Sequence, residues 1–309
     1  MNPKDVHVAV LMGGWSAERP VSIDSGNGCA AALESEGFKV TKVDVDRDIA
    51  ATLKALKPDV AFNALHGPYG EDGKIQGLLE ILDIPYTHSG VLASSVGMDK
   101  VKSRAVFESV GIPVARGMVV NRLDAAKAHV MEPPYVIKPI SEGSSFGVFI
   151  VHADQAHPPQ ELFADDWAFG DDVLVENFVD GLELTCAVMG DRALDIIEIR
   201  PQTKFYDYEA KYAPGGSIHV LPASLKPNIY RNIQKISLEA HRALGCRGVS
   251  RADFRLDDRP DGTGALVCLE VNTQPGMTAT SLVPEIAAHA GIGFGALVRW
   301  MVEDASCNR

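Results

Sequence analysis

The chain has 309 residues, of which 46% are hydrophobic and 23% charged, a composition typical of folded proteins and unlike that of disordered or fibrous chains. This length accommodates two or three domains with a sizeable core. The net charge of −12 argues against a general binder of nucleic acids or anionic membranes, so an anionic ligand needs a local cluster of basic residues or a metal ion.

The N-terminal segment is polar, and the short apolar run after it contains His7, which makes a poor signal peptide. No apolar run is long enough to span a bilayer. The cysteines are odd in number and form no CxxC pair; they lie at positions 29, 186, 246, 268 and 307. This pattern is typical of reduced thiols rather than a disulfide framework or a zinc site, so we expect a cytoplasmic protein.

The first third of the chain alternates apolar runs with helical patterns. The runs predict strands at residues 6–12, 39–45, 59–65 and 84–86, separated by helices at 21–36, 49–56 and 73–82. This alternation predicts a Rossmann-like parallel sheet with helices on both faces. Ligands of such sheets bind beyond the carboxyl ends of the strands, where residues 13–19 and 66–73 form loops.

Gly26-x-Gly28-x-x-Ala31 resembles a dinucleotide fingerprint, but it lies inside a predicted helix rather than at a strand-to-helix turn. We interpret it as small residues that pack on the sheet; an NAD-dependent oxidoreductase is the alternative and predicts NADH binding. Gly73-Lys74 is followed by Ile75, which excludes a P-loop. The sequence contains no HExxH motif.

The pattern changes at residues 89–98, a stretch of small residues that predicts a linker before a helix at 100–110. Strands dominate thereafter; they are predicted at residues 118–120, 135–138, 148–151, 173–178, 183–189 and 195–200. A polar stretch rich in Tyr, Lys and Gly then predicts a mobile loop within residues 202–220. An amphipathic helix ending at Leu244, strands at 249–256 and 265–271, and two helices, the first at 282–290, complete the chain.

The last two predicted strands carry polar residues two apart, which share a face on a strand. Arg251 and Asp253 lie on one strand, and Glu270 and Asn272 on the next. If the strands pair with matching faces, Asp253, Glu270 and Asn272 converge as oxygen ligands of the kind that Mg²⁺ prefers. Arg251 beside them would stabilise developing negative charge. The alternative is a salt-bridge ladder on the surface of a hairpin.

Pro275-Gly276 turns the chain after Asn272, and Thr280 or Ser281 caps the following helix. The free N–H groups at the start of that helix offer a site for an anion. The stretch therefore combines a metal site with an anion site, unless its polar residues are incidental to a strand, a turn and a helix.

A Gly/Ser loop follows the strand that ends at Lys138 and contains Ser144 and Ser145. Such a loop folds its N–H groups over phosphates, and the Lys supplies positive charge. Residues 176–179 form a polar hinge that suits adenine, with Glu183 suited to ribose hydroxyls; a solvated turn is the alternative. The tyrosine-rich stretch 205–212 suits a lid, or else an exposed loop packed by its own aromatics.

These pieces, in this order, resemble the ATP-grasp ligases and, among them, the D-alanine–D-alanine ligase family, along nearly the whole chain. The first domain has Glu18, which suits a cationic amine, and His66, which suits a substrate hydrogen bond. The matching motifs are Gly13-Gly14-x-Ser16-Ala17-Glu18-Arg19, His66-Gly67 to Glu71-Asp72-Gly73, Glu142-Gly143-Ser144-Ser145-x-Gly147, Tyr206-Asp207-Tyr208-Glu209-Ala210-Lys211-Tyr212, and Glu270-x-Asn272-Thr273-x-Pro275-Gly276-Met277-Thr278.

The resemblance implies an ATP-grasp fold of the mixed α/β (α+β) class, with domains at residues 1–95, 96–180 and 181–309 and ATP between the second and third. It implies ATP-dependent ligation of two D-alanine molecules, through D-alanyl phosphate, to D-alanyl-D-alanine for peptidoglycan precursors. It also implies a homodimer and two Mg²⁺ ions, replaceable by Mn²⁺, on Asp253, Glu270 and Asn272.

The resemblance further assigns roles to residues. Phosphate contacts are implied for Lys100, Lys138, Ser145 and Lys211, and nucleoside contacts for Glu176, Asn177, Phe178, Val179 and Glu183. Glu18 would take the ammonium of the first D-alanine near His66, with Ser144 and Tyr212 hydrogen-bonded to Glu18. Arg251 and the N–H of Gly276 would stabilise the tetrahedral intermediate, and Ser281 and Leu282 would bind the carboxylate of the second D-alanine.

Three positions depart from the commonest family pattern, namely Pro20, Ser141 and Gln274, and none of them removes an expected ligand. The tyrosine pattern around Tyr212 favours the dipeptide over D-alanyl-D-lactate. Two further alternatives are a ligase for another amine or hydroxy acid and a nucleotide sensor with a degenerate site. The sensor predicts ATP binding without amino-acid-dependent hydrolysis.

Overall fold

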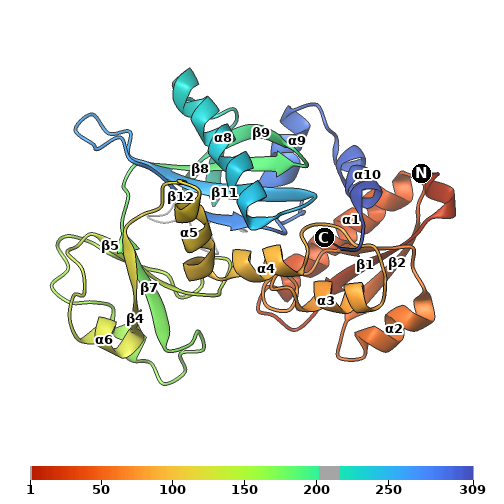
Figure 1. Ribbon diagram of the computed structural model, residues 1–309, viewed down its shortest axis with the longest axis horizontal. Helices are drawn as coiled ribbons and strands as arrows, with labels where there is room; N and C mark the ends of the chain where they lie inside the picture. Colours follow the sequence, from red (N-terminus) through yellow and green to blue (C-terminus); the bar gives the residue numbers. More distant parts are fainter. Residues whose placement is uncertain (1, 202–215, 309) are drawn as a thin grey trace.

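The computed structural model describes residues 2–201 and 216–308. Its strands form three sheets, with the first at one end of an elongated molecule, the second at the other end and the third between them (Figure 1). Both chain ends lie in the part that contains the first sheet (Figure 1). Among the described residues, no helix has the length and apolar character needed to cross a membrane.

The first sheet is parallel, as the alternating pattern predicts. Its order is β2-β1-β3, formed by β1 (His7–Gly13), β2 (Lys39–Val45) and β3 (Val60–Asn63). Helices cover both faces: α1 (Arg19–Ser35) and α10 (Phe294–Asp304) on one, and α2 (Ile49–Leu56) and α3 (Lys74–Ile81) on the other. Because both faces are covered, β1 is a continuous apolar run rather than an alternating one.

Gly26 shows why α1 contains a run of small residues. A Cβ atom at Gly26 would lie 2.5 Å from the Cβ of Met12 on β1, so only glycine allows this approach of helix and strand. The small residues therefore pack on the sheet, as the sequence predicts, and the dinucleotide interpretation finds no support in their position.

Two predicted features of this region are wrong. Residues 84–86 form no strand; Tyr86 makes only isolated bridges to Ala61 and Ser306, since Pro85 has no N–H with which to continue a ladder. The predicted linker at 89–98 contains α4 (Val91–Met98), so the expected boundary at 95/96 falls inside a helix. The small residues here serve close packing: a Cβ at Gly97 would lie 2.7 Å from the Cγ2 of Thr273.

The second sheet is antiparallel, in the order β4-β7-β5-β6. Its strands are β4 (Gly117–Asn121), β5 (Tyr135–Pro139), β6 (Phe149–Val151) and β7 (Asp172–Asn177). This sheet comes after α5 (Lys100–Ser109) in the chain and packs on α6 (Arg122–Lys127) and on a short 3-10 helix at Gln160–Phe163. A second 3-10 helix, at Pro3–Asp5, precedes β1. The pattern reading missed α6, although Asn121 caps it through a 3.0 Å bond from the N–H of Leu123.

The third sheet is also antiparallel, in the order β10-β9-β8-β11-β12. Its strands are β8 (Leu182–Met189), β9 (Arg192–Pro201), β10 (Ser217–Val220), β11 (Val249–Leu256) and β12 (Leu266–Asn272). Helix α8 (Pro227–Leu244) packs on one face and α9 (Leu282–His289) on part of the other. The loop was expected within residues 202–220, but Ser217–Val220 form the strand β10, which pairs with β9. Residues 202–215 of the expected loop lie outside the described range.

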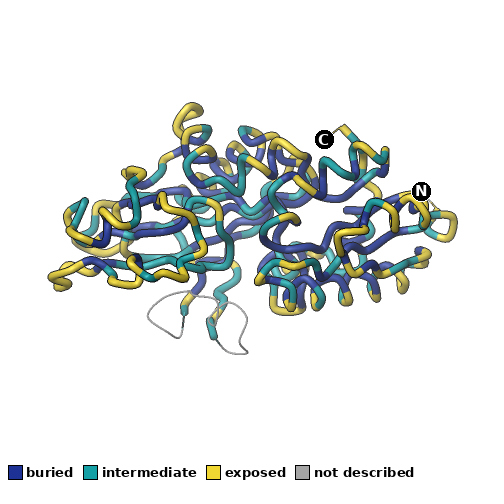
Figure 2. The backbone as a smooth tube through the Cα atoms, turned by 90° about the horizontal axis from the view of Figure 1, so that it is seen from below, coloured by how far each residue is buried: buried dark blue, intermediate teal, exposed yellow. Residues whose placement is uncertain are grey.

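Most strands run through the interior of the molecule, whereas the edge strands β4 and β10 contain no buried residue, and exposed residues concentrate on loops and outer helix faces (Figure 2). The face of the third sheet that α9 leaves uncovered, together with the loops around it, positions the site.

Candidate active site

The polar residues predicted on β11 and β12 converge. Asp253 lies directly opposite Glu270 in the register of the two strands, and Arg251 lies opposite Asn272. Opposite residues share a face, so all four side chains lie on the face away from α8. Ala252, between Arg251 and Asp253, points into the buried core. The condition of paired strands with matching faces is met.

Asp253 and Glu270 are both engaged by cationic side chains. Arg251 donates from Nε to Asp253 Oδ1 at 2.9 Å and from Nη2 to Oδ2 at 2.7 Å, and Thr185 Oγ1 donates to Oδ1 at 2.6 Å. The Nζ of Lys100 lies 3.5 Å from Glu270 Oε2. The negative charge of this face is therefore compensated by residues of β11 and α5.

The chemistry of this donor set fits a hard cation. Within residues 2–201 and 216–308, no group of three or more His, Cys, Asp or Glu side chains is arranged to hold a metal ion. The expected set is different, because it joins two carboxylates to the amide oxygen of Asn272. Carboxylate and amide oxygens are what Mg²⁺ prefers, with water and phosphate oxygens completing its shell.

A cavity lies between the second and third sheets, and every described residue expected to contact ATP lines it. These residues are Lys100, Lys138, Ser145, Glu176, Asn177, Phe178, Val179 and Glu183. Asp253 and Glu270 line the same cavity, so a nucleotide there would meet the acidic face. Lys211 lies outside the described residues.

The side chain of Glu176 forms ion pairs within the wall of this cavity. It is 3% exposed, and its two oxygens lie 2.5 Å from Lys138 Nζ and 2.6 Å from Arg104 Nη1. The carboxylate of Glu176 is therefore already paired within the protein. Sequence reasoning missed Arg104, because only the packing of α5 beside β7 brings it to Glu176.

Arg255 organises the hinge after β7 and was also missed. Its Nη1 lies 3.2 Å from Glu183 Oε2, its Nε donates to the carbonyl of Val179 at 3.0 Å, and its guanidinium lies 5.4 Å from the ring centre of Phe178. A signal existed in the sequence, since Arg255 continues the alternation of Arg251 and Asp253 on one face of β11.

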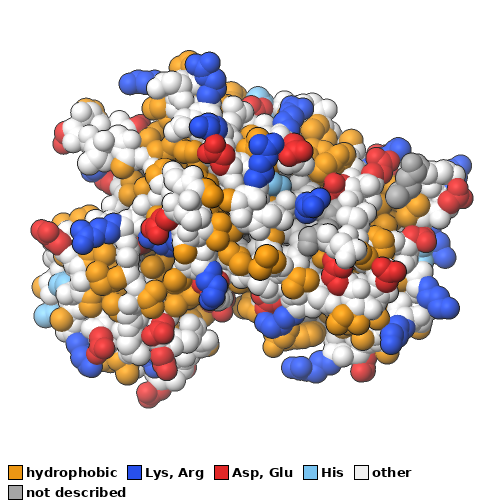
Figure 3. All heavy atoms as spheres, in the orientation of Figure 1, with side chains coloured by type: hydrophobic (Ala, Val, Ile, Leu, Met, Phe, Trp, Pro, Cys, Tyr) orange, Lys and Arg blue, Asp and Glu red, His pale blue; other side chains and the backbone are white. Residues whose placement is uncertain are grey.

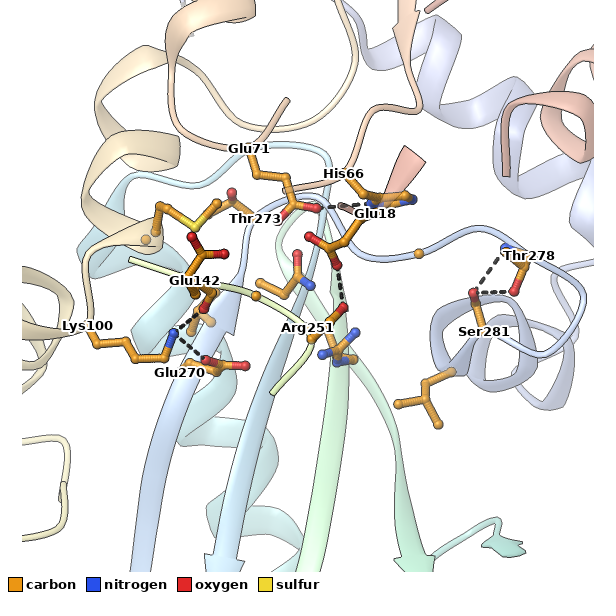
Figure 4. A pocket seen from close by; sticks show the side chains of 18 of the residues that line it. Glu18, His66, Glu71, Lys100, Glu142, Arg251, Glu270, Thr273, Thr278 and Ser281 are labelled. Carbon is orange, nitrogen blue, oxygen red and sulfur yellow. Dashed lines mark hydrogen bonds and ion pairs between the residues drawn. The ribbon is translucent and has the colours of Figure 1, made fainter. Parts of the chain in front are cut away.

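A second, adjoining cavity lies between the first domain and the third sheet. The expected substrate and catalytic residues that line it are Glu18, His66, Ser144, Arg251, Gly276, Ser281 and Leu282 (Figure 4). Lys100, Glu142 and Glu270 are among the residues that line both cavities, so the two cavities adjoin here.

Glu18 is buried at the junction of the first domain with the Gly/Ser loop. It is 6% exposed, and the hydroxyl of Ser144 donates to its Oε1, which is the hydrogen bond that the resemblance implies. A Cβ at Gly67 would lie 2.5 Å from Glu18 Oε2, and one at Gly143 would lie 3.2 Å away. Glycines at these positions let two loops approach one carboxylate. Tyr212, the other expected partner, lies outside the described residues.

His66 is held on both sides of its ring. Its Nδ1 lies 3.0 Å from Glu71 Oε1, and its Nε2 lies 3.1 Å from the hydroxyl of Ser25 (Figure 4 shows the bond to Glu71). Glu71 was quoted in a motif without a role, yet it lines the substrate cavity.

Glu142 is a further residue that sequence reasoning left without a role. Burial raises the pKa of its carboxyl, the charge of Glu18 raises it further, and Lys100 opposes the shift. Lys100 Nζ donates to the carbonyl of Glu142 at 2.5 Å and approaches Glu270 on its other side (Figure 4). Lys100 thus links the Gly/Ser loop to the acidic face.

The start of α9 closes the substrate cavity. Ser281 is its N-cap residue but makes no side-chain cap bond; its hydroxyl accepts instead from the N–H of Thr278 at 2.9 Å. A Cβ at Gly276 would lie 2.9 Å from this hydroxyl, so the turn needs glycine to pass Ser281. The N-terminus of α9 therefore faces the cavity, as expected for an anion site.

The charges on the visible surface are mixed. Lys and Arg side chains are interspersed with Asp and Glu over the face shown in Figure 3.

Comparison with known proteins places the chain. Residues 106–303 match the family model described as D-ala D-ala ligase C-terminus, and residues 47–89 match the model described as D-ala D-ala ligase N-terminus. The D-alanine–D-alanine ligases of Methylocella silvestris and Beijerinckia indica are 69% and 67% identical over 304 residues, covering 98% of this chain and 99% of each relative.

Two solved structures of D-alanine–D-alanine ligase from Bacillus anthracis are similar over 97% of both chains. One, complexed with ATP, has a TM-score of 0.79 at 31% identity, and the other has a TM-score of 0.81 at 34% identity. The fold is the ATP-grasp fold of these ligases. On these matches, the chain belongs to the D-alanine–D-alanine ligase family.

Proposed function

We propose that this protein joins two D-alanine molecules to D-alanyl-D-alanine at the expense of ATP, supplying the dipeptide for peptidoglycan precursors. The observation that carries the proposal is the adjacency of two cavities that share Lys100, Glu142 and Glu270 in their linings, one with groups suited to a nucleotide and the other with groups suited to an amine and a carboxylate. This is the arrangement needed to phosphorylate an amino acid carboxylate and then capture it with an amine.

The first D-alanine binds with its ammonium at Glu18, whose carboxylate is buried and oriented by Ser144. His66 adjoins it, oriented by Glu71. Burial strengthens the attraction between Glu18 and a cation, because the local dielectric is low. The substrate carboxylate then points toward the junction with the nucleotide cavity.

ATP lies in the other cavity with its adenine at the backbone of residues 176–179 and its ribose at Glu183. Lys100, Lys138 and the Gly/Ser loop at Ser145 neutralise the phosphates; Lys211 joins them from the segment outside the described range. Asp253, Glu270 and Asn272 would hold two Mg²⁺ ions, which offset the charge that develops during phosphoryl transfer. Mn²⁺ has the same ligand preference and replaces them.

The second D-alanine binds with its carboxylate at the start of α9, at Ser281 and Leu282. Its amine attacks the acyl carbon of D-alanyl phosphate, the C–O bond to phosphate breaks, and phosphate leaves. Arg251 and the N–H of Gly276 stabilise the oxyanion of the tetrahedral intermediate. For Tyr212, which lies outside the described residues, the proposed role is to exclude water, which would protect the acyl phosphate.

Phosphate release tests the proposal directly. Purified protein with ATP and Mg²⁺ releases phosphate when D-alanine is added and forms one D-alanyl-D-alanine per phosphate. D-lactate and D-serine, offered in place of D-alanine, distinguish a ligase of other specificity. ATP binding without D-alanine-dependent turnover would contradict the proposal and favour a nucleotide sensor.

We also propose three domains, each built around one sheet. The ranges expected from the sequence are residues 1–95, 96–180 and 181–309. Because α4 extends past residue 95, we place the first boundary at Asp99 instead. The cytoplasm is the proposed location, supported by five cysteines that are all free thiols and by the use of ATP.

A homodimer is proposed from family membership, and light scattering of the purified protein tests it.

A further inference from the structure

A buried pair of side-chain amides joins the two loops that face each other across the substrate cavity. Asn63 ends β3 just before the loop that carries His66, and Gln274 lies in the loop that carries Gly276. They are 0% and 1% exposed, and Asn63 Nδ2 donates to Gln274 Oε1 at 2.6 Å. The Nε2 of Gln274 donates in turn to the carbonyl of Leu65.

Hydrogen bonds extend from this pair in both directions. Asn63 Nδ2 also donates to the carbonyl of Gly70 at 3.0 Å, and Asn63 Oδ1 accepts from the N–H of Leu65 at 3.2 Å. On the other side, the backbone N–H of Gln274 donates to Asn272 Oδ1 at 3.0 Å. The connection therefore runs from the loop after β3 to a proposed metal ligand.

A second link lies at Met277, five residues after Asn272 and on the far side of Gly276. The N–H of Met277 donates to the hydroxyl of Ser25 at 3.3 Å, and the same hydroxyl lies 3.1 Å from His66 Nε2. The loop with Gly276 is thus attached to the first domain on both sides of that glycine.

The choice of amides at a buried contact has a physical consequence. Burying an amide costs free energy unless its polar atoms form hydrogen bonds, whereas apolar side chains would fill the same space without this requirement. Apolar contacts, however, permit one loop to slide against the other, whereas directional hydrogen bonds specify a single offset.

We propose that Gln274 is a positioning residue that acts through Asn63 to set the offset between the two D-alanine subsites. This inference rests on the proposed function, in which Glu18 and His66 hold the first D-alanine and the loop with Gly276 guides the attack of the second. The correct offset brings the amine onto the acyl phosphate. When the offset is lost, water takes the place of the amine.

Hydrolysis of D-alanyl phosphate can be detected from the ratio of phosphate to dipeptide. Water attacks the acyl carbon of D-alanyl phosphate, the C–O bond to phosphate breaks, and D-alanine and phosphate are released. Each such event consumes ATP and yields phosphate without dipeptide. The ratio of phosphate to D-alanyl-D-alanine therefore reports the alignment of the subsites, which a merely structural role of Gln274 would not change.

The experiment compares wild-type protein, Gln274→Met and a control, Gln234→Met, with phosphate and dipeptide measured in the same samples. Gln234 lies on α8, away from both cavities, and its Nε2 donates to the carbonyl of Leu194 at 2.7 Å, so its substitution also removes a glutamine-to-carbonyl bond. For Gln274→Met we expect at least about two phosphates per dipeptide and a KM for D-alanine raised about tenfold, with a KM for ATP within about twofold of wild type. The control keeps a ratio of about one.

A ratio of one with an unchanged KM for D-alanine in Gln274→Met would overturn the inference. If that variant does not fold, Gln274→Asn keeps the amide but is shorter by one methylene group, and it must show the same excess of phosphate; coupled turnover in this variant also overturns the inference. Absence of D-alanine-dependent phosphate release in the wild type would instead refute the proposed function.

Discussion

At the scale of single residues, the site is built from charged groups that are already paired. Asp253 has Arg251 and Thr185 as partners, and Glu176 lies between Lys138 and Arg104. Paired charges are tolerated in a half-buried cavity, whereas unpaired ones are costly. On the proposed function, binding of a nucleotide and metal ions would redistribute these partners, with Arg251 and Lys100 changing from intramolecular to ligand contacts.

Replacement of Asp253 tests the proposed metal site. We expect Asp253→Ala to lower kcat by roughly a hundredfold and to raise the Mg²⁺ concentration needed for half-maximal rate, because one of two carboxylate ligands is removed. Steady-state phosphate release over a Mg²⁺ titration measures both quantities. Asp191→Ala, which removes an exposed carboxylate 3.2 Å from Arg242, serves as the control and keeps wild-type kinetics. Unchanged Mg²⁺ dependence in Asp253→Ala would remove Asp253 from the site.

At the scale of elements, glycines decide how closely loops approach one another. The Gly/Ser loop between β5 and β6 ends at Gly147, which has a φ of +66° and packs against Phe169 and Pro139. A Cβ there would lie 2.9 Å from both neighbours, so the loop depends on glycine for conformation and for space.

We expect Gly147→Ala to raise the KM for ATP about tenfold, since the displaced loop no longer covers the phosphates in the same geometry. Gly170→Ala is the matched control, because Gly170 has a φ of +83° but no atom within 4 Å of an added Cβ. That control carries backbone strain of about 1 kcal/mol without a steric clash. Steady-state kinetics at varied ATP measures the difference, and equal KM values in the two variants would show that the contact with Phe169 is irrelevant to binding.

At the scale of the whole molecule, the sites exist only where three sheets meet. Glu18 and His66 come from the first domain, Ser144 from the second, and Arg251 and Gly276 from the third. Helix α10 returns from the end of the chain to pack on α1, which ties the third domain to the first (Figure 1). Stability of this assembly is therefore a condition for activity.

The stability of the folded chain also depends on a buried histidine. His241 is 4% exposed, with Nδ1 2.7 Å from the hydroxyl of Ser250, and burial lowers its pKa from 6.5 to about 4. The unfolded chain takes up this proton near pH 6.5, whereas the folded chain takes it up only near pH 4. The stabilisation is therefore complete above pH 6.5 and is lost progressively as the pH falls toward 4.

We expect His241→Asn to reduce the loss of stability between pH 7 and pH 5 by about 2 kcal/mol, because the titrating group is absent. Urea unfolding at both pH values, followed by circular dichroism, gives the free energies of unfolding. His289→Asn, at a histidine whose side chain is 41% exposed, is the control. An unchanged pH dependence in His241→Asn would show that other groups cause the acid sensitivity.

Most of the order of elements, and the residues proposed as metal ligands, could be predicted from the sequence alone. Apolar periodicity is a local property, so it predicted the parallel first sheet, α8, and the strands β11 and β12. The period of two placed Asp253 and Glu270 on one face on the condition that these two strands pair with matching faces. Periodicity did not predict two local features: residues 91–98 form a helix whose Gly97 packs closely on Thr273, and residues 84–86, which include Pro85, form only isolated bridges.

Contacts between distant segments were decided only by the tertiary structure. Arg104 meets Glu176, Ser25 meets His66, and Asn63 meets Gln274 across 211 positions of sequence. No local pattern encodes such pairs, because each depends on how whole domains are placed. The residues proposed to carry the chemistry could thus be predicted from the sequence, whereas the residues that hold them in position could not.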